Sequence, residues 1–352
     1  MKTKRSVREA LLALAVLGVL GFGIVGCDNG STDVDNTGGH VHEWDEWTVK
    51  TPASILAAGE EQRICKLDAS HTDERAIARL TSLIETVEVL GGSFMYGRNG
   101  TTIHEDDTLT PVSTFNMGKH PVTQGQWKAV MEENPSVFDG TNKRDFVNGG
   151  YIAATPTFNR DNLPVEAVSW YDVLVFANKL SEQDGLQPAY KIKESTDPAV
   201  WGAVPETNND AAWDAVEVVT GANGWRLPSE YQWEFAAKGG RNLKDYTGTE
   251  ADTYFLYSGS NLDELGDFAV HYENSEGRTH EVGERKPNEL GLYDMSGNVL
   301  EWCFEMRDET SANRVIRGGS WFNSAPTARS ANRGSERPFI RYSNIGFRLV
   351  RP

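Results

Sequence analysis

Cysteine is scarce in this sequence, with three in 352 residues, and three thiols cannot build the disulfide framework of a small secreted scaffold. Positive charge is also in short supply. The 34 Lys and Arg residues against 51 Asp and Glu give a net charge of -17, which argues against a nucleic-acid-binding surface. With 39% hydrophobic and 24% charged residues the chain has enough apolar side chains for a core, which excludes wholesale disorder. We therefore expect a folded protein without a nucleic-acid partner.

Long apolar runs are also few, and the one near the N-terminus follows basic residues. The run from Ala10 to Val25 is too short to span a bilayer comfortably, but it has the length of a secretory signal. It ends at Ile24-Val25-Gly26-Cys27, which resembles the lipobox of bacterial lipoproteins. That resemblance implies that Cys27 is lipidated and tethers the mature protein to a membrane, with the cell envelope and its outer surface as the expected location. A plain signal peptide or a short membrane anchor is the alternative.

The composition divides the remaining chain into segments. Residues 28–39 are polar and rich in Gly, Asn and Asp, which is typical of a flexible tether. Residues 40–85 predict a small β-rich module, and residues 86–352 predict one long domain. In the module, His40, His42, Cys65 and His71 have no common zinc-site spacing, so surface histidines and a buried thiol are favoured. Pairing of Cys65 with Cys303 stays open.

Three helices of the long domain are predicted by capping boxes, in which a Ser or Thr and a residue three positions later bond each other's backbone amides. These pairs are Thr123 with Gln126, Ser169 with Asp172, and Ser229 with Gln232. The second helix carries an apolar stripe, and Gly185 and Gly239 are expected as left-handed C-terminal caps. Alternating residues predict strands at 85–90 and at 345–351, the latter with Phe347 and Leu349 on one face.

Two acidic residues flank a predicted turn at residues 296–298. Asp294 and Glu301 offer hard anionic oxygens, and the turn can aim carbonyl groups inward, which is the ligand set that calcium prefers. The alternative is two surface carboxylates beside a tight turn.

The C-terminal segment 314–352 has eight arginines, no lysine and the single acid Glu336. Arginine without lysine favours planar, bidentate or stacked structural contacts over a generic charged face. We expect Arg329, Arg333, Arg341 and Arg348 to hold the scaffold.

Eight motifs, read in order, resemble the formylglycine-generating enzyme (sulfatase-modifying factor) family over about three quarters of the chain. They are Gly92-Ser-Phe-Met-Tyr-Gly97, Pro121-Val-Thr-Gln124, Leu163-Pro-Val-Glu-Ala-Val-Ser-Trp170, Gly224-Trp-Arg-Leu-Pro-Ser-Glu230, Trp233-Glu-Phe-Ala236, Gly291-Leu-Tyr-Asp-Met-Ser-Gly-Asn298, Arg317-Gly-Gly-Ser-Trp321 and Ile345-Gly-Phe-Arg348. The resemblance implies an α+β fold of the C-type lectin type, with a small twisted antiparallel sheet, flanking helices and many loops. It also implies structural calcium, held by Asp294, Gly297, Val299 and Glu301 and, in a looser match, by Asn261, Leu262, Asn274 and Glu276.

The family's catalytic chemistry does not carry over to this chain. Its enzymes bind copper through two cysteines shortly after the Gly-Gly-Ser-aromatic motif, and Asn323 stands where the first would be. An amide cannot replace a thiolate as a soft, redox-active ligand. No cysteine follows Cys303 and no histidine follows His280, which also removes the ligands of iron-dependent relatives. We predict no catalytic residues and no catalytic cofactor.

The same tail also resembles the variable regions of surface lipoproteins, known from treponemes, whose genes retroelements rewrite at template adenines. Glu336 does not fit the codon pattern of such positions, and an ordinary surface loop is the alternative. The predicted variable, ligand-binding positions are Phe322, Asn323, Ser324, Pro326, Thr327, Gly334, Ser335, Phe339, Ile340, Tyr342, Ser343 and Asn344.

Together these patterns predict a non-catalytic, surface-displayed lipoprotein that binds an extracellular ligand, either a protein or a cell surface. Phe322, Phe339, Ile340 and Tyr342 would be exposed aromatic and apolar anchors on one face, among adaptable polar residues. A metal-dependent oxidoreductase of the sulfatase-modifying type and a passive structural module of the envelope are the alternatives.

Overall fold

The computed structural model describes residues 42–51, 59–77, 82–97, 109–140, 146–147, 150–151, 160–240, 257–259, 264–308 and 310–352. The predicted signal peptide with Cys27, the tether at 28–39, and Asn261 and Leu262 of the looser calcium site lie outside the described residues. Contacts divide the chain into two compact units, Met1–Thr81 and Ser82–Pro352.

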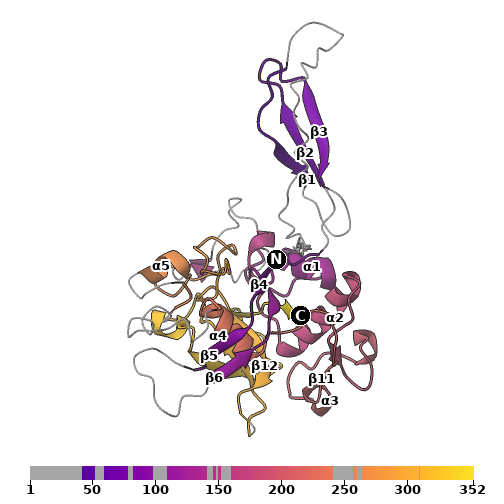
Figure 1. The fold of residues 1–352 in the computed structure, drawn as a ribbon, viewed down its shortest axis with the longest axis vertical. Coiled ribbons are helices and arrows are strands. Elements are labelled where there is room, and N and C mark those ends of the chain that lie inside the picture. Colours follow the sequence, from indigo (N-terminus) through magenta and orange to yellow (C-terminus); the bar gives the residue numbers. More distant parts are fainter. Residues whose placement is uncertain are drawn as a thin grey trace, which may run out of the picture. The chain divides into compact units, whose positions relative to one another are not determined.

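The described part of the first unit is a three-stranded antiparallel sheet with the order β1-β2-β3 (Figure 1). Its strands are β1 (Thr48–Thr51), β2 (Gly59–Ile64) and β3 (Thr72–Ile77). The Arg63 guanidinium lies 5.0 Å from the ring centre of Trp44 and 4.7 Å from that of Trp47, so arginine–aromatic contacts support this small sheet. His42 stacks on Trp44 and its ring lies 4.9 Å from that of His71, but the described residues contain no group of three or more side chains placed to bind a metal.

The second unit combines several small sheets with few helices. A four-stranded sheet has the order β14-β13-β12-β15 and a three-stranded sheet the order β16-β7-β4; pairs β5-β6, β8-β9 and β10-β11 complete the set. The strands are β4 (Thr86–Val89), β5 (Gly92–Met95), β6 (Leu109–Val112), β7 (Phe115–Gly118), β8 (Phe146–Val147), β9 (Gly150–Tyr151), β10 (Tyr190–Lys191), β11 (Glu217–Val218), β12 (Leu300–Met306), β13 (Arg314–Arg317), β14 (Arg333–Glu336), β15 (Ile345–Gly346) and β16 (Val350–Arg351).

Each predicted capping box is present at the start of its helix. Thr123 precedes α1 (Gln124–Met131), Ser169 precedes α2 (Trp170–Gln183) and Ser229 precedes α4 (Glu230–Ala237). Short helices α3 (Ala211–Asp214) and α5 (Leu265–Phe268) complete the described set. Gly185 and Gly239 have φ angles of 70° and 76°, as expected for left-handed caps. Within the described residues, none of the helices has the length and apolar character needed to cross a membrane.

Helix α2 is the centre of the main core. The predicted stripe of Val173, Phe176, Ala177 and Leu180 is fully buried, but neighbours outside the stripe are buried as well. The Phe176 ring stacks on Trp127 at 5.0 Å and meets Phe347 edge-on at 5.3 Å. A helix that is buried on almost every side is enclosed by other elements, so α2 is more central than its sequence pattern predicts.

The C-terminal end of the chain connects two sheets where one continuous strand was predicted. β15 pairs in parallel with β12, and β16 pairs antiparallel with β7, so the chain passes from one sheet to the other between them. Phe347 and Leu349 are both fully buried, as their alternation predicts.

Arg348 lies at this crossing and is fully buried. Its Nε and Nη2 donate to the two carboxylate oxygens of Glu301 on β12 at 2.7 Å each, and Trp233 Nε1 donates to Glu301 Oε2 at 2.6 Å. The same guanidinium donates to the carbonyls of Gly118 at 3.0 Å and Tyr293 at 2.8 Å. One side chain therefore joins β12, the end of β7 and the loop before β12.

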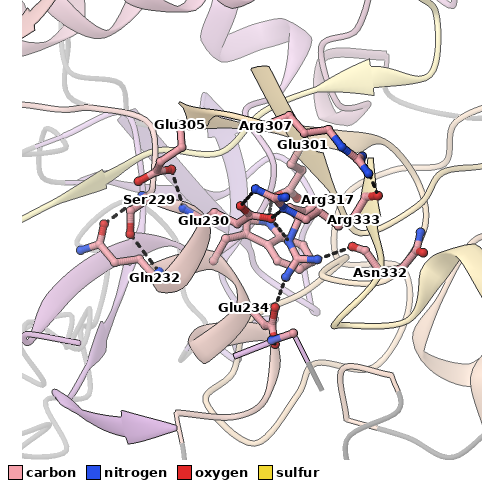
Figure 2. A network of polar contacts seen from close by, with 12 residues as sticks. Ser229, Glu230, Gln232, Glu234, Glu301, Glu305, Arg307, Arg317, Asn332 and Arg333 are labelled. Carbon is pink, nitrogen blue, oxygen red and sulfur yellow. Dashed lines mark hydrogen bonds and ion pairs between the residues drawn. The ribbon is translucent and has the colours of Figure 1, made fainter. Parts of the chain in front are cut away.

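A second buried ionic cluster links α4 to β13 and β14 (Figure 2). Arg333 donates to both carboxylate oxygens of Glu230, at 2.6 and 2.7 Å, and Arg317 Nε lies 3.5 Å from the same carboxylate. Arg317 also pairs with Glu234, which Lys238 contacts at 2.6 Å. Bidentate arginine–carboxylate contacts of this kind fix the orientation of both partners.

We expect Arg348→Ala to lower the free energy of unfolding by about 3–5 kcal/mol, because it leaves the Glu301 carboxylate buried without a cation. Arg333→Ala should have a smaller effect, because Arg317 still neutralises Glu230 and the lost side chain is 34% exposed. Urea unfolding of the two variants measures the difference. Equal losses in both would contradict a dominant role for Arg348.

Candidate binding face

Two segments of the tail, residues 320–324 and 342–344, are bonded to each other. Trp321 Nε1 donates to the carbonyl of Ser343 at 3.0 Å, and Asn344 Nδ2 donates to Ser320 Oγ at 3.3 Å. The Trp321 amide also donates to the carbonyl of Asn298 at 2.8 Å. Trp321 therefore ties both segments to the loop before β12 and brings distant predicted variable positions together.

The side chains on these two segments differ in exposure. Phe322 is 60% exposed and Tyr342 is 49% exposed, which is unusual for aromatic side chains of this size. Ser324 and Pro326 are also exposed, while Asn323, Thr327, Ser343 and Asn344 are half-buried. The Phe322 ring rests edge-on against Trp321, with ring centres 5.4 Å apart. Most of these positions can thus contact a ligand.

Tyr272 adds a third exposed aromatic side chain that the sequence patterns did not predict. It is 64% exposed, and its amide donates to the carbonyl of Asn323 at 2.9 Å. No motif includes Tyr272, because it approaches the tail only through this tertiary hydrogen bond. We call Tyr272, Phe322 and Tyr342 the aromatic face.

Phe339 and Ile340 do not belong to the exposed set that was predicted. Phe339 is only 9% exposed and is part of the main core, so its prediction as an exposed anchor is wrong. Ile340 is half-buried and packs against the same core. The reason is local: the Trp170 amide at the start of α2 donates to the carbonyl of Pro338, and that contact holds the segment against the helix.

Gly334 and Ser335 lie on the edge strand β14. They pair with Ile316 and Val315 of β13, and both are half-buried. A Cβ atom at position 334 would lie 2.9 Å from Ile316 Cγ1, which is too close for a larger residue without a shift. Variation at position 334 is therefore restricted by the neighbouring Ile316 side chain.

Bidentate contacts of the tail arginines are confirmed at three of the four predicted positions. Besides Arg333 and Arg348, Arg341 donates to both oxygens of Asp172 at 2.7 and 2.9 Å. Because Asp172 also completes the capping box of α2, Arg341 links the loop at 342–344 to the start of the core helix. Arg329 is half-buried and forms no ion pair with another described residue.

The described thiols are far from a reactive arrangement. Cys65 and Cys303 are both buried, and burial raises the pKa of the Cys303 thiol well above its usual range. At position 323 the Asn side-chain oxygen accepts a hydrogen bond from Ser320 Oγ at 2.7 Å, so this amide serves to shape the loop.

The predicted calcium ligands around the turn at 296–298 are buried. Asp294 accepts from the Gly283 amide at 2.8 Å and from Asn298 Nδ2 at 3.3 Å, and desolvation raises its pKa to about 6. A bound cation would offset that cost of burial. Glu301 already accepts from Arg348 and Trp233, so it would offer calcium its remaining lone pairs, beside the carbonyls of Gly297 and Val299. Calcium binding at this turn stays a prediction, with Asp294 as its main charged ligand.

At the looser site, only Asn274 and Glu276 are described. The Asn274 side chain accepts from the His271 amide at 2.8 Å and donates to the carbonyl of Ala269 at 2.9 Å. Glu276 has a φ angle of 55° and is exposed, with an oxygen 3.4 Å from Arg278. These contacts close a local turn, and calcium binding there stays a prediction.

Comparisons with known proteins agree with this architecture. The model of the sulfatase-modifying factor enzyme 1-like domain matches residues 73–352. Chaperone protein LppX of Paenibacillus barcinonensis is 36% identical over 264 residues, which are 69% of this chain and 81% of that protein. The structure of Treponema denticola variable protein 1 has a TM-score of 0.60 and 33% identity, covering 76% of this chain and 95% of that one.

A third relative bears on activity. Inactive C-alpha-formylglycine-generating enzyme 2 of Bos taurus is 32% identical over 148 residues, which are 40% of this chain and 48% of that protein. The similarities confirm the α+β fold predicted from the eight motifs.

If Asp294 holds calcium, a chelator should lower the melting temperature, because an ion bound only to the folded state stabilises it by mass action. Asp294→Ala should abolish this sensitivity, whereas Asp308→Ala, which changes an exposed carboxylate, should keep it. The measurement is thermal unfolding with and without calcium. As a further control, the protein is refolded in chelator and calcium is then added. An unchanged melting temperature after this addition would contradict the calcium site.

Proposed function

The chain belongs to the sulfatase-modifying factor enzyme 1-like family, and on that premise we propose that it is a non-catalytic lipoprotein that displays a variable ligand-binding face at the cell surface. The observation that carries the proposal is the aromatic face: Tyr272, Phe322 and Tyr342 are exposed by 64%, 60% and 49%. Large, exposed aromatic side chains held on ordered loops are the usual anchors of protein–protein interfaces.

Chemistry at the tail supports binding over catalysis. Asn323 stands where the family's enzymes have a copper-binding cysteine, and its amide is bonded to Ser320. The family includes a relative that is named inactive, so loss of catalysis is compatible with the fold. The oxidoreductase alternative would need a thiol or histidine ligand set, and the described residues contain no group of three or more His, Cys, Asp or Glu side chains placed to bind a metal.

The loops are built so that their side chains can change at low cost. Trp321 Nε1, the Trp321 amide and the Tyr272 amide all donate to backbone carbonyls, at positions 343, 298 and 323. Bonds to carbonyls survive when the side chain at the accepting position changes. Ser320, which accepts from Asn344, is itself fully buried. A retroelement could therefore rewrite exposed residues of these loops while the support beneath them stays constant.

An extracellular protein is the ligand class we favour. Aromatic anchors surrounded by Ser, Thr and Asn resemble the composition of antibody binding loops, which adapt to protein surfaces. The net charge of -17 opposes binding to nucleic acid. Lipidation at Cys27 would place the chain on the membrane, and the tether at 28–39 would extend it outward.

We expect Phe322→Ala with Tyr342→Ala to change the free energy of unfolding by no more than about 0.5 kcal/mol per site, because both side chains are exposed. Phe339→Ala is the matched control and should cost about 3–5 kcal/mol, because it opens a cavity in the core. Chemical denaturation measures both. A large loss in the double variant would show that these rings support the fold.

The same double variant should lose ligand binding. Surface plasmon resonance tests this prediction by comparing how the wild-type protein and the double variant bind a panel of purified extracellular matrix and serum proteins. One chemically unfolded protein belongs in the panel, because a 36% identical relative is named a chaperone. Binding that survives in the folded double variant would exclude the aromatic face as the contact surface.

We expect Cys27 to be acylated. Metabolic labelling with a fatty-acid probe should mark the wild-type protein, and Cys27→Ser should lose the label, because the thioether-linked lipid needs the cysteine sulfur. Equal labelling of the two proteins would rule out the lipoprotein assignment, whereas the binding experiment above does not depend on it.

A further inference from the structure

A pocket of about 430 Å³ lies away from the aromatic face, between β6, β11, β12 and the start of α4. Figure 1 shows β6 beside α4. The wall of the pocket is mixed: Val112, Leu227 and Phe304 form an apolar part, polar and charged side chains line the rest, and Val218 and Tyr231 are exposed at its rim. Its volume lies within the range of sites for small molecules.

Arg226 places a guanidinium in this pocket. Its backbone pairs with Val350 on β16, so the residue has a fixed position in the fold. Its Nη1 donates to the carbonyl of Leu227 at 3.0 Å and to Gln232 Oε1 at 2.9 Å. These two bonds orient one nitrogen of the planar group and leave the rest of the fork available to a carboxylate.

Glu305 places a carboxylate in the same pocket. Its Oε2 accepts from the Glu230 amide at the start of α4 at 2.7 Å (Figure 2). Burial raises the pKa of Glu305 and lowers the pKa of Arg226, because neither charge is fully compensated for the water it has lost.

The start of α4 sets the two charges close together. Gln232 Oε1 accepts from the Ser229 amide at 3.1 Å and from Arg226, while Glu305 accepts from the next amide in the chain. The two opposite charges are therefore anchored at neighbouring backbone positions, yet Arg226 and Glu305 are not ion-paired with each other. A ligand that carries both charges on adjacent atoms would compensate both.

We propose that this pocket binds a free α-amino acid with an apolar side chain, whose carboxylate pairs with Arg226, whose ammonium group pairs with Glu305 and whose side chain packs against Val112 and Phe304. The site is distinct from the aromatic face and does not depend on the proposed function. An α-amino acid carries its two charges on neighbouring groups, and the two charges of the pocket are anchored at the neighbouring amides of Ser229 and Glu230.

The test compares three probes by isothermal titration calorimetry at neutral pH: L-phenylalanine, 3-phenylpropionate, which lacks the ammonium group, and phenethylamine, which lacks the carboxylate. The wild-type protein should bind L-phenylalanine at least about tenfold more tightly than either analogue, since each lost charged contact removes a charge-assisted hydrogen bond. No binding of L-phenylalanine at millimolar concentration, or equal binding of 3-phenylpropionate, would overturn the proposal.

Two variants assign the charges. Glu305→Gln keeps an oxygen that can accept from the Glu230 amide, and it should reduce L-phenylalanine binding to the level of 3-phenylpropionate while leaving the latter unchanged. Arg226→Gln should weaken both carboxylate ligands by about tenfold. The double variant of Phe322 and Tyr342 should bind L-phenylalanine as the wild type does. Unchanged L-phenylalanine binding in Glu305→Gln would contradict the site, and loss of binding in the double variant would contradict its separation from the aromatic face.

Discussion

The buried ion pair between Arg348 and Glu301 connects the parts of the large unit that no sheet or helix connects. Two charges removed from water are costly unless they meet in good geometry, and here the contact is bidentate, with Trp233 donating to the same carboxylate. The remaining guanidinium donors satisfy the carbonyls of Gly118 and Tyr293. All of these bonds can form together only when β12, β7 and the loop before β12 are in their places. The network therefore selects one arrangement of sheets that are too small to fix their relative positions by themselves.

The same tail that supplies this pair also carries the exposed loops, and the two roles are separated by residue type. Arginines at 333, 341 and 348 reach back to carboxylates on α4, α2 and β12, so replacing any of them removes a contact that holds the tail to the scaffold. Tyr342 lies between Arg341 and Arg348, Phe322 lies between Arg317 and Arg333, and both aromatic side chains are exposed to solvent. Because ionic contacts of the arginines hold the scaffold, the exposed side chains of the same segment are not needed for stability. A binding face can vary only where its side chains are not needed for stability.

Local chemistry accounts for the predictions that held. The capping boxes at Thr123, Ser169 and Ser229 involve residues three positions apart, so their geometry is complete within one helical turn. The bidentate role of the arginines also follows from the side chain itself, whose planar fork suits carboxylates. The predicted exposure of Phe339 failed because burial depends on what lies opposite a residue, and α2 lies opposite Phe339 through the contact with Pro338.

The sequence by itself determined the family's fold, the starts of the helices and the arginine-rich character of the tail, since these depend on short-range spacing or on motifs in order. Only the tertiary structure decided which carboxylate each arginine meets, that the Tyr272 backbone is bonded to the loop that carries Phe322, and that Gly334 and Ser335 belong to an edge strand. It also decided that Arg226 and Glu305 share one pocket without pairing. These outcomes depend on contacts between residues that are far apart in the chain. The spacing of residues along the sequence does not show which distant side chain packs against a given residue.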